Sequence, residues 1–326
     1  MASWGSRVDC SASAQTYADL LQQWQQFGAI IVTPCAFQRN GLLDAAEDFT
    51  TAIGKRVLGR RGQGCQGAKT RVDTCQFAEI GLSQRKGVQD GMMNMWKSNW
   101  ATHDIATDRD VRELIEYLHD GHRPSPFQTK NWYLGSMVPT HADLIFHDSW
   151  PTRGLLVGTW LALEDVSPLA GPLVYFNGSH NEGLWDFEAL NLTSHTSSNA
   201  TKVLDPYQTY SKTLHALVTR RGMSSTMALL KKGQMLIWRG NILHGGAQVR
   251  DWNLTRKAIT THYFVDGARR FWNPLMSAGT GAHIRASPSF ISPRRIATSA
   301  GASSPLRAVS SAHSPRKEHE QGANKR

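Results

Sequence analysis

Apolar residues near the start of the chain recur at the spacing of an amphipathic helix. Between residues 17 and 27 they fall three or four positions apart, serines precede them as candidate N-caps, and Gly28 stands where the helix should end. The next residues, 29–32, form a short apolar run that predicts a strand. The pattern therefore predicts a helix followed at once by a strand.

Two further helices are predicted before the β-prone part of the chain. One covers residues 42–55. The other covers residues 111–118, with Asp108 or Asp110 as its N-cap and Gly121 at its end. The first third of the chain is therefore expected to be mainly helical.

From residue 131 onward the pattern changes to short β-prone runs separated by Gly, Pro and Asn. The predicted strands cover residues 131–138, 154–163, 172–176, 235–238 and 258–265. Short strands with frequent turns are typical of a β-barrel or jelly roll. We expect a mainly β domain with flanking α-helices.

The segment of residues 181–232 interrupts these strands. It is rich in Ser, Thr and Asn and carries Trp185, Phe187 and Tyr207. Such an insertion commonly covers a binding site as a lid, and a plain surface excursion explains it equally well. Both interpretations stay open at this point.

The composition is that of an ordinary globular protein, with 40% hydrophobic and 19% charged residues in a chain of 326. The net charge of +10 suggests nucleic-acid binding until it is located. Residues 281–326 hold eight Lys or Arg and two Glu, so this segment supplies +6 and the rest of the chain only +4. The charge therefore requires no phosphate-binding surface, and we expect no nucleic-acid partner.

The C-terminal segment, residues 281–326, is also rich in Ala and Ser and has no aromatic residue after Phe290. We expect it to be a disordered basic tail that follows a single domain of residues 1–280. The tail is a candidate binding segment for an acidic partner, although a solvated tail without a specific role is the simpler interpretation.

The four cysteines show neither a CxxC pair nor zinc-ribbon spacing. No apolar stretch resembles a signal-peptide core or approaches the roughly 18 residues of a membrane span. The last residues do not match a peroxisomal signal either. We therefore expect reduced thiols and a cytoplasmic protein without a membrane span.

Two separated fragments carry the candidate chemistry. His141-Ala142-Asp143 is the one His-x-Asp pattern in the chain, and its spacing in an extended segment directs both side chains to the same side. His244 follows 103 residues after His141, and Arg256 follows another 12 residues later. Two imidazoles and a carboxylate can hold Fe(II) on one face and leave three positions open. A guanidinium can grip a carboxylate, such as the distal one of 2-oxoglutarate.

The distal fragment is predicted to lie on two strands. Residues 233–238 form a strand that leads into His244, and residues 256–264 form another. Alternation places Arg256, Ala258 and Thr260 on one face of the second strand. Lys257 points the other way and is expected in solvent.

Histidine-aspartate neighbours are less informative, because adjacent residues on a strand point to opposite faces. We expect the pairs to lie on the surface or in loops: His103-Asp104, His119-Asp120 and His147-Asp148. His147 is the rival metal ligand, since it alternates in phase with His141. A partly buried histidine near the mouth of the site is the preferred interpretation for it.

Two segments between the fragments complete an ordered pattern. They are Trp160-Leu-Ala-Leu-Glu-Asp165 and Gly171-Pro-Leu-Val-Tyr-Phe-Asn-Gly-Ser-His180. With the fragments, in this order and spacing, they resemble the phytanoyl-CoA dioxygenase family of Fe(II)- and 2-oxoglutarate-dependent oxygenases. Its members share HxD, W-x-A-L-x-D, a turn ending in PGSH or PGTH, a distal His-Gly and R-K-A-I-S/T. The resemblance covers about residues 131–265 and extends weakly to residues 27–32.

The resemblance implies a double-stranded β-helix, or jelly-roll, barrel with the N-terminal helices of about residues 1–125 packed outside. It implies that iron binds to His141, Asp143 and His244. Arg256 would bind the C5 carboxylate of 2-oxoglutarate. Trp160 would lie beside this cosubstrate, and packing in the core is the plainer role for it.

The chain departs from the family pattern at several positions. Asn177 replaces a proline, Gln234 replaces an aspartate, and Gly246 stands where many members have a serine that can bind the cosubstrate. His180 matches a structural residue and is not counted as a ligand. We find no match for the family's upstream lysine contact to 2-oxoglutarate, so the set of cosubstrate contacts is incomplete.

The resemblance implies an enzyme that uses Fe(II), 2-oxoglutarate and O2. The reaction would be hydroxylation of an aliphatic C–H bond in a small-molecule or acyl-type substrate, with release of succinate and CO2. The Trp- and Met-rich first third and the insertion of residues 181–232 would form the pocket, which suggests an apolar or amphipathic substrate. The alternative is a catalytically inert or regulatory binding protein of the same fold. A cupin-type enzyme is disfavoured, because the chain has no HxH pair.

Overall fold

The computed structural model describes residues 9–10, 15–38, 41–61, 91–192, 206–267 and 269–272. All of these residues belong to one unit, Met1–Pro293. The predicted tail of residues 281–326 lies outside the described residues, as do Cys65 and Cys75. The extent of the domain, residues 1–280, stays a prediction.

The first helix, α1 (Tyr17–Phe27), covers the predicted residues and ends at Gly28, whose φ of 73° is left-handed. Its N-cap is Thr16 and not one of the expected serines. The Thr16 hydroxyl accepts a hydrogen bond from the Asp19 N–H, and the Asp19 carboxylate accepts one from the Thr16 N–H. This reciprocal capping box sets where the helix begins.

Four more α-helices follow in the described residues: α2 (Leu42–Arg61), α4 (Trp100–Ala106), α5 (Arg109–Leu118) and α6 (Pro206–Arg220). Helix α2 continues past its predicted end at residue 55. Helix α5 is capped by Asp108, whose carboxylate accepts the Val111 N–H at 3.0 Å, so Asp110 is not the cap. The sequence pattern did not predict α4 or α6.

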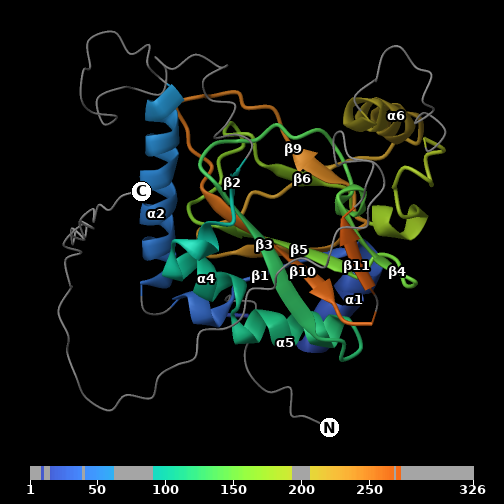
Figure 1. Cartoon of the computed structure of the whole chain (residues 1–326), viewed down its shortest axis with the longest axis horizontal. Helices are drawn as coiled ribbons and strands as arrows, with labels where there is room; N and C mark the ends of the chain where they lie inside the picture. Colours follow the sequence, from blue (N-terminus) through green and yellow to red (C-terminus); the bar gives the residue numbers. More distant parts are fainter. Residues whose placement is uncertain are drawn as a thin grey trace, which may run out of the picture. The chain divides into compact units, whose positions relative to one another are not determined.

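The strands form antiparallel sheets, so the fold mixes helices with antiparallel β-structure (Figure 1). The largest sheet has the order β1 (Ala29–Val32), β8 (Met235–Arg239), β5 (Leu156–Ala162), β10 (Ala258–Val265), β3 (Pro124–Trp132), β2 (Met92–Met93). A second sheet has the order β7 (Thr226–Met227), β6 (Leu173–Tyr175), β9 (His244–Gly246). A third is the pair β11 (Arg269–Trp272) and β4 (His147–Trp150).

The prediction of a strand over residues 131–138 is wrong, because the strand there is β3, which ends at Trp132. Pro124 and Pro126 weaken the strand signal in this region, because proline lacks the backbone N–H that a sheet uses. Both prolines instead lie in the first three residues of β3. Pro126 is opposite Tyr263, next to the register shift between His262 and Tyr263 in β10. A strand tolerates the missing N–H of a proline at its first residues and beside a register shift.

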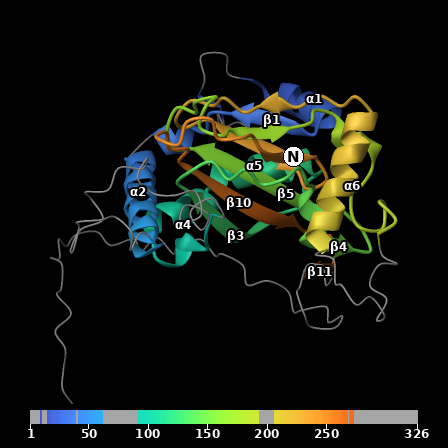
Figure 2. The same ribbon diagram turned by 90° about the horizontal axis from the view of Figure 1, so that it is seen from above.

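One face of the largest sheet packs against helices (Figure 2). Val157, Ile237 and Tyr263 on the sheet share a buried apolar cluster with Leu20 and Trp24 of α1. The same cluster includes seven residues of α2, α4 and α5: Ala46, Ala101, Ile105, Val111, Leu114, Ile115 and Leu118. The opposite face of the sheet carries Trp160, Trp238 and Thr260, which line a cavity together with the candidate residues. Within the described residues, no helix has the length and apolarity needed to cross a membrane.

The expectation of reduced thiols is wrong for two of the cysteines. Cys10 and Cys35 form a disulfide with a Cα–Cα distance of 5.1 Å. Backbone contacts bring them together, because the Cys10 N–H donates to the Thr33 carbonyl and Asp9 pairs with Pro34. No sequence pattern indicated this pairing, since 25 residues separate the two cysteines and neither belongs to a recognisable motif.

Candidate functional site

The two candidate fragments meet through a backbone bridge. The His141 N–H donates to the His244 carbonyl at 2.8 Å, and the His244 N–H donates to the His141 carbonyl at 2.9 Å. His244 begins β9, and Asp143 begins the short 3-10 helix Asp143–Ile145. The bridge therefore brings histidines that are 103 positions apart in the sequence onto one site.

His141, Asp143 and His244 present one ligand atom each within 4.8 Å of one another. Oδ1 of Asp143 lies 3.7 Å from Nε2 of His141 and 3.6 Å from Nε2 of His244. A divalent ion about 2.0–2.2 Å from each nitrogen and oxygen fits between ligand atoms with such separations. In the described residues this is the one group of His, Cys, Asp or Glu side chains with this arrangement.

The orientation of both histidines is set by their own backbone. Nδ1 of His141 lies 2.8 Å from the Pro139 carbonyl, and Nδ1 of His244 lies 3.2 Å from the Ile242 carbonyl. A carbonyl can only accept, so each Nδ1 carries the proton and each Nε2 keeps its lone pair. Burial lowers the pKa of His141 to about 3 and also lowers the pKa of His244. Both rings are therefore neutral, as metal ligands must be.

The second oxygen of Asp143 is held by neighbouring side chains. The indole Nε1 of Trp238 donates to Oδ2 at 2.9 Å, and Nε2 of His262 lies 3.4 Å from the same oxygen. Burial on its own would raise the pKa of Asp143, but the imidazoles of His244 and His262 outweigh it and hold this pKa well below its usual value. The carboxylate is thus ionised, with Oδ1 left toward the histidines.

Gly158 makes room for the tryptophan that holds Asp143. It is paired with Trp238 across β5 and β8, and a Cβ at Gly158 would lie 2.2 Å from the indole ring. Any larger residue would push the ring, and with it the hydrogen bond to Asp143, out of place.

Arg256 is a buried cation that forms no ion pair with a carboxylate among the described residues. It is 2% exposed, and its Nη atoms donate to the carbonyls of Gly171 at 3.2 Å and Leu134 at 3.4 Å. The rings of Trp132 and Trp160 both lie 5.5 Å from the guanidinium carbon. Nε has no hydrogen-bond partner among the described residues, and burial lowers the pKa of the group to about 10. A bound carboxylate would satisfy this donor and offset the cost of burying the charge.

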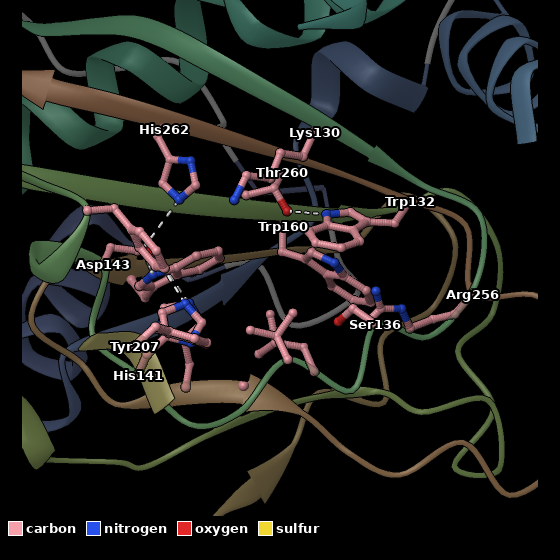
Figure 3. Close-up of a pocket in the computed structure, with 16 residues that line it drawn as sticks. Lys130, Trp132, Ser136, His141, Asp143, Trp160, Tyr207, Arg256, Thr260 and His262 are labelled. Atoms are coloured by element: carbon pink, nitrogen blue, oxygen red, sulfur yellow. Dashed lines mark hydrogen bonds and ion pairs between the residues drawn. The ribbon is translucent and has the colours of Figure 1, made fainter. Parts of the chain in front are cut away.

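The triad and Arg256 line one cavity of about 230 Å³ (Figure 3). Its walls come from both larger sheets, with Trp160 and Thr260 on one side and Leu173 and His244 on the other. The remaining lining residues are Lys130, Trp132, Ser136, Val138, His141, Asp143, Phe146, Tyr207, Trp238, Gly245, Arg256 and His262. The arrangement can hold a divalent metal ion at the triad and a carboxylate at Arg256 in the same space.

Other predicted residues lie outside the triad. His147 is buried and contacts the rings of Phe127 and His262, at centroid distances of 5.2 Å and 6.2 Å, so it is no part of the ligand group. His180 lies 3.1 Å from the Gln25 carbonyl of α1. Trp160 is buried, as packing in the core requires, and it also lines the cavity.

Predictions about three polar residues are wrong. His103 of the His103-Asp104 pair is buried on helix α4 and is neither on the surface nor in a loop. Asp148 of the His147-Asp148 pair is fully buried and not on the surface, because Arg153 and the N–H groups of Ser149 and Gly154 satisfy it. Lys257 does point away from the cavity, but it is not in solvent. Its ammonium forms ion pairs with Glu47 of α2 and with Glu164.

Several cavity residues were not singled out from the sequence: Lys130, Trp132, Ser136, Trp238 and His262. Alternation along β10 gave a signal for His262, since it shares a face with Thr260. Trp238 likewise ended a predicted strand. Lys130 had no usable signal, because its strand was predicted seven residues too late at its start, at residue 131 and not at 124.

The side chain of Ser136 occupies the space beside Gly246, where a larger residue would place its own side chain. A Cβ at Gly246 would be 2.9 Å from Oγ of Ser136 and 2.7 Å from the backbone nitrogen of Met137. A serine at position 246 would therefore collide with this loop. The loop itself brings a hydroxyl to the cavity in its place.

Comparison with solved structures gives distant likenesses. The chain is 16% identical to the non-heme alpha ketoglutarate dependent epimerase SnoN from nogalamycin biosynthesis, with a TM-score of 0.47, covering 84% of this chain and 94% of that one. It is 15% identical to EctD from S. alaskensis with 2-oxoglutarate and 5-hydroxyectoine, with a TM-score of 0.47, covering 79% of this chain and 80% of that one. A comparison with curated protein sequences gives no match.

A family model gives a direct match. The model described as Phytanoyl-CoA dioxygenase (PhyH) matches residues 65–257, which is more than half of the 326 residues. The matched range contains His141, Asp143, His244 and Arg256, together with both segments between the fragments.

Proposed function

Since this chain belongs to the phytanoyl-CoA dioxygenase family of Fe(II)- and 2-oxoglutarate-dependent oxygenases, we propose that it hydroxylates an aliphatic C–H bond of a small-molecule or acyl-type substrate. Succinate and CO2 would be released. The observation that carries the proposal is the meeting of three ligand atoms within 4.8 Å in a cavity also lined by Arg256, which is buried and forms no ion pair with a carboxylate among the described residues.

We propose that His141, Asp143 and His244 bind the iron. Their Nε2 atoms and Oδ1 converge, and both histidine Nδ1 atoms are already engaged by backbone carbonyls. Such second contacts orient the ligands before the metal arrives. Three ligands on one face leave positions open for cosubstrate and O2, so the set suits a reactive centre and not a closed structural one.

We propose that the C5 carboxylate of 2-oxoglutarate binds to Arg256. Its unpartnered Nε and the two flanking indole rings fit a carboxylate that arrives from the cavity. Ser136 would add a hydroxyl donor, in place of the serine that Gly246 lacks. Trp160 would lie along the cosubstrate between Arg256 and the iron.

When bound, the iron supplies the oxidising chemistry, which couples O2 and 2-oxoglutarate to oxidation of the substrate. The protein side chains contribute position and charge. Trp238 keeps Asp143 turned so that one oxygen faces the histidines. The indole rings and the apolar lining exclude water from the cavity, which strengthens the charge interactions inside it.

The ligand assignment is tested by Asp143→Ala. We expect iron-dependent turnover of 2-oxoglutarate to succinate to fall by roughly a hundredfold or more, because the one anionic ligand is gone. Asp165→Ala is the matched control, since this carboxylate is exposed and pairs with Lys231. An Asp143→Ala protein that makes succinate at the wild-type rate would contradict the assignment.

The alternative of an inert binding barrel is tested by a spectrum. Fe(II) and 2-oxoglutarate are added to the purified protein without oxygen, and the visible charge-transfer band of the chelate is recorded. We expect the band in the wild-type protein and its loss in Asp143→Ala. Absence of the band at saturating concentrations in the wild-type protein would favour the inert barrel.

We propose a jelly-roll barrel, with the N-terminal helices outside it, as the fold family of this structure. The layered sheets and the helices that pack on one sheet face support it. We also propose that the insertion is a lid. Tyr207 of α6 lines the cavity, and the hydroxyl of Tyr210 accepts the Ala142 N–H at 3.1 Å, inside the ligand fragment.

We propose an apolar or amphipathic substrate, because Val138, Phe146, Leu173 and Tyr207 line the cavity beside the triad. Binding of the basic segment of residues 281–326 to an acidic partner is a separate proposal, which rests on its charge. Deletion of that segment should then leave 2-oxoglutarate turnover unchanged.

A cytoplasmic location is also proposed from the sequence, and the Cys10–Cys35 disulfide bears on it, because such bonds are more common in oxidising compartments. Alkylation of thiols in intact cells before lysis tests the location. Alkylated Cys10 and Cys35 would support the cytoplasm, and protected ones would place the protein in an oxidising compartment.

A further inference from the structure

A lysine that the proposed reaction does not use extends into the cavity. Lys130 lies on β3, is partly buried and lines the same space as the triad (Figure 3). Its ammonium lies 6.0 Å from the ring centre of Trp132. Among the described residues, its ammonium forms no hydrogen bond or ion pair, and Asp143 is the one charged group that shifts its pKa. A partly buried ammonium without a partner is energetically costly, and an anion bound in the cavity would remove this cost.

The sheet register separates Lys130 from Arg256. Lys130 is opposite Thr260 on β10, which is opposite Trp160 on β5. Arg256 precedes Thr260 by four residues on the same face, which is about 13 Å along an extended strand. The backbone positions of the two cations therefore lie on separate rows of the sheet. Their side chains approach the same ring, since the Lys130 ammonium lies 6.0 Å and the Arg256 guanidinium carbon 5.5 Å from the ring centre of Trp132.

Lys130 is also close to the metal side of the cavity. Its row on the sheet is next to the row of His262, which contacts Asp143. Burial lowers the pKa of Lys130, and the charge of Asp143 opposes this shift, although the two groups form no ion pair. An anion beside the ammonium would remove the cost of its burial.

A count of formal charges shows what is missing. Among the described lining residues, Arg256 and Lys130 are cations and Asp143 is the one anion. The two charges of Fe(II) and the one of Arg256 balance Asp143 and the two carboxylates of 2-oxoglutarate. The charge of Lys130 is then left over, in a space where buried charges need partners.

We propose that Lys130 binds an anionic group, a carboxylate, of the primary substrate. This inference rests on the proposed function, and it refines the amphipathic substrate to one whose anionic end lies at Lys130. The apolar part would lie along Val138, Phe146 and Tyr207, which line the same cavity. Both carboxylates of 2-oxoglutarate already have partners, the distal one at Arg256 and the other at the metal.

The test compares two probes that differ by one charge. Octanoate and octanamide are titrated into protein loaded with Mn(II) and N-oxalylglycine, an inert analogue of 2-oxoglutarate, and binding is followed by ligand-observed NMR. We expect octanoate to bind roughly tenfold tighter than octanamide to the wild-type protein, because a charged hydrogen bond of this kind is worth about that factor.

Three variants locate the effect. Lys130→Met removes the charge at similar size and should abolish the preference for octanoate, while Lys130→Arg should keep most of it. Lys231→Met is the control, since Lys231 is exposed and pairs with Asp165. Its preference should equal that of the wild-type protein. Thermal denaturation of each variant verifies that it is folded.

The outcomes separate this inference from the proposed function. Equal binding of the two probes to the wild-type protein would overturn the inference, and so would a preference that survives Lys130→Met. A Lys130→Met protein that binds N-oxalylglycine about tenfold more weakly would also overturn it, because the lysine would then serve the cosubstrate. Failure of the wild-type protein to bind Mn(II) and N-oxalylglycine would instead contradict the proposed function.

Discussion

Trp238 shows how one indole supports the candidate centre. Its Nε1 donates to Oδ2 of Asp143, so Oδ1, which lies nearest His141 and His244, is free to bind metal. The ring also lies 5.0 Å from that of His244, centre to centre. One side chain thereby positions two of the three proposed ligands.

We predict that Trp238→Phe weakens metal binding by about 10- to 100-fold, the usual effect of losing a contact behind a ligand. Phenylalanine keeps most of the ring packing and loses the donor. Titration with Fe(II) or Mn(II) measures the affinity. The matched control is Trp185→Phe, which loses an indole hydrogen bond to the Ser179 carbonyl and none to a candidate ligand. Equal effects of the two variants would argue against a positioning role for Trp238.

Ser136 is the residue that we expect to replace the missing serine. We predict that Ser136→Ala raises the dissociation constant of 2-oxoglutarate by about 3- to 10-fold, because one hydrogen bond to a charged group is lost. Metal affinity should not change. The charge-transfer band, titrated with 2-oxoglutarate under anaerobic conditions, measures the constant. An unchanged constant would show that Gly246 has no substitute.

The residues that we propose to bind the metal and the cosubstrate could be predicted from the sequence. The residues that hold them in position could not. His141, Asp143, His244 and Arg256 stand in a recognisable order, and the structure brings them to one cavity. Lys130 was missed because it lies on β3, and the two prolines at the start of that strand weaken the pattern that would have predicted it. Contacts such as Trp238 to Asp143 join positions 95 residues apart, and no local pattern encodes them.

At the scale of elements, helix α5 has titratable caps with opposite behaviour. Burial raises the pKa of Asp108 from 3.8 to about 6 at its N-terminus. Burial lowers the pKa of His119 from 6.5 to about 4 at its C-terminus. The Asp108 contribution to stability is present below pH 3.8 and lost as the pH rises through about 6. The His119 contribution is present above pH 6.5 and lost as the pH falls toward about 4.

We predict that Asp108→Asn stabilises the protein at pH 7 by about 2 kcal/mol, because asparagine caps a helix well and carries no charge to bury. The gain should shrink as the pH falls toward 4. His119→Gln should instead gain stability relative to wild type over the same fall in pH. Urea denaturation at pH 7 and pH 4.5 measures both. A pH-independent difference for either variant would refute the assigned shift.

The strands were predictable where apolar alternation was continuous and hard to predict where it was short. The predicted strands over residues 29–32 and 258–265 match β1 and β10. The short strands β2, β7 and β9 have two or three residues each, too few for a periodic signal. Helix α6 was hidden inside the polar insertion, although its buried Tyr210 and Leu214 are spaced as on a helix face.

At the scale of the whole molecule, the disulfide ties the N-terminal segment to the residues that follow β1. Its loop spans 25 residues, which corresponds to about 3 kcal/mol of stability from the restricted unfolded chain. We predict that a reductant lowers the stability of the wild-type protein by about this amount. Chemical denaturation with and without reductant measures it. The control is the double variant Cys10→Ser and Cys35→Ser, which should not respond to reductant.

The family could be recognised from the sequence because its pattern serves the metal and cosubstrate, which all members share. The layering of the sheets and the Cys10–Cys35 bond could not, since both depend on which distant segments pack together. The identity of the substrate could not be predicted from the sequence either. The contacts that we propose for it are with residues such as Lys130 and Tyr207, which line the cavity and belong to no motif of the resemblance.

The backbone bridge between His141 and His244 has a consequence for the life of the protein in a cell. The two ligands are neighbours only in the folded chain, so a metal ion bound there favours folding by mass action, by about 2.7 kcal/mol at a hundred times its dissociation constant. Chain opening and digestion by proteases would then slow as the metal is supplied. In a cell that is short of iron, more of this protein would be degraded. Its abundance would then fall without any change in the expression of its gene.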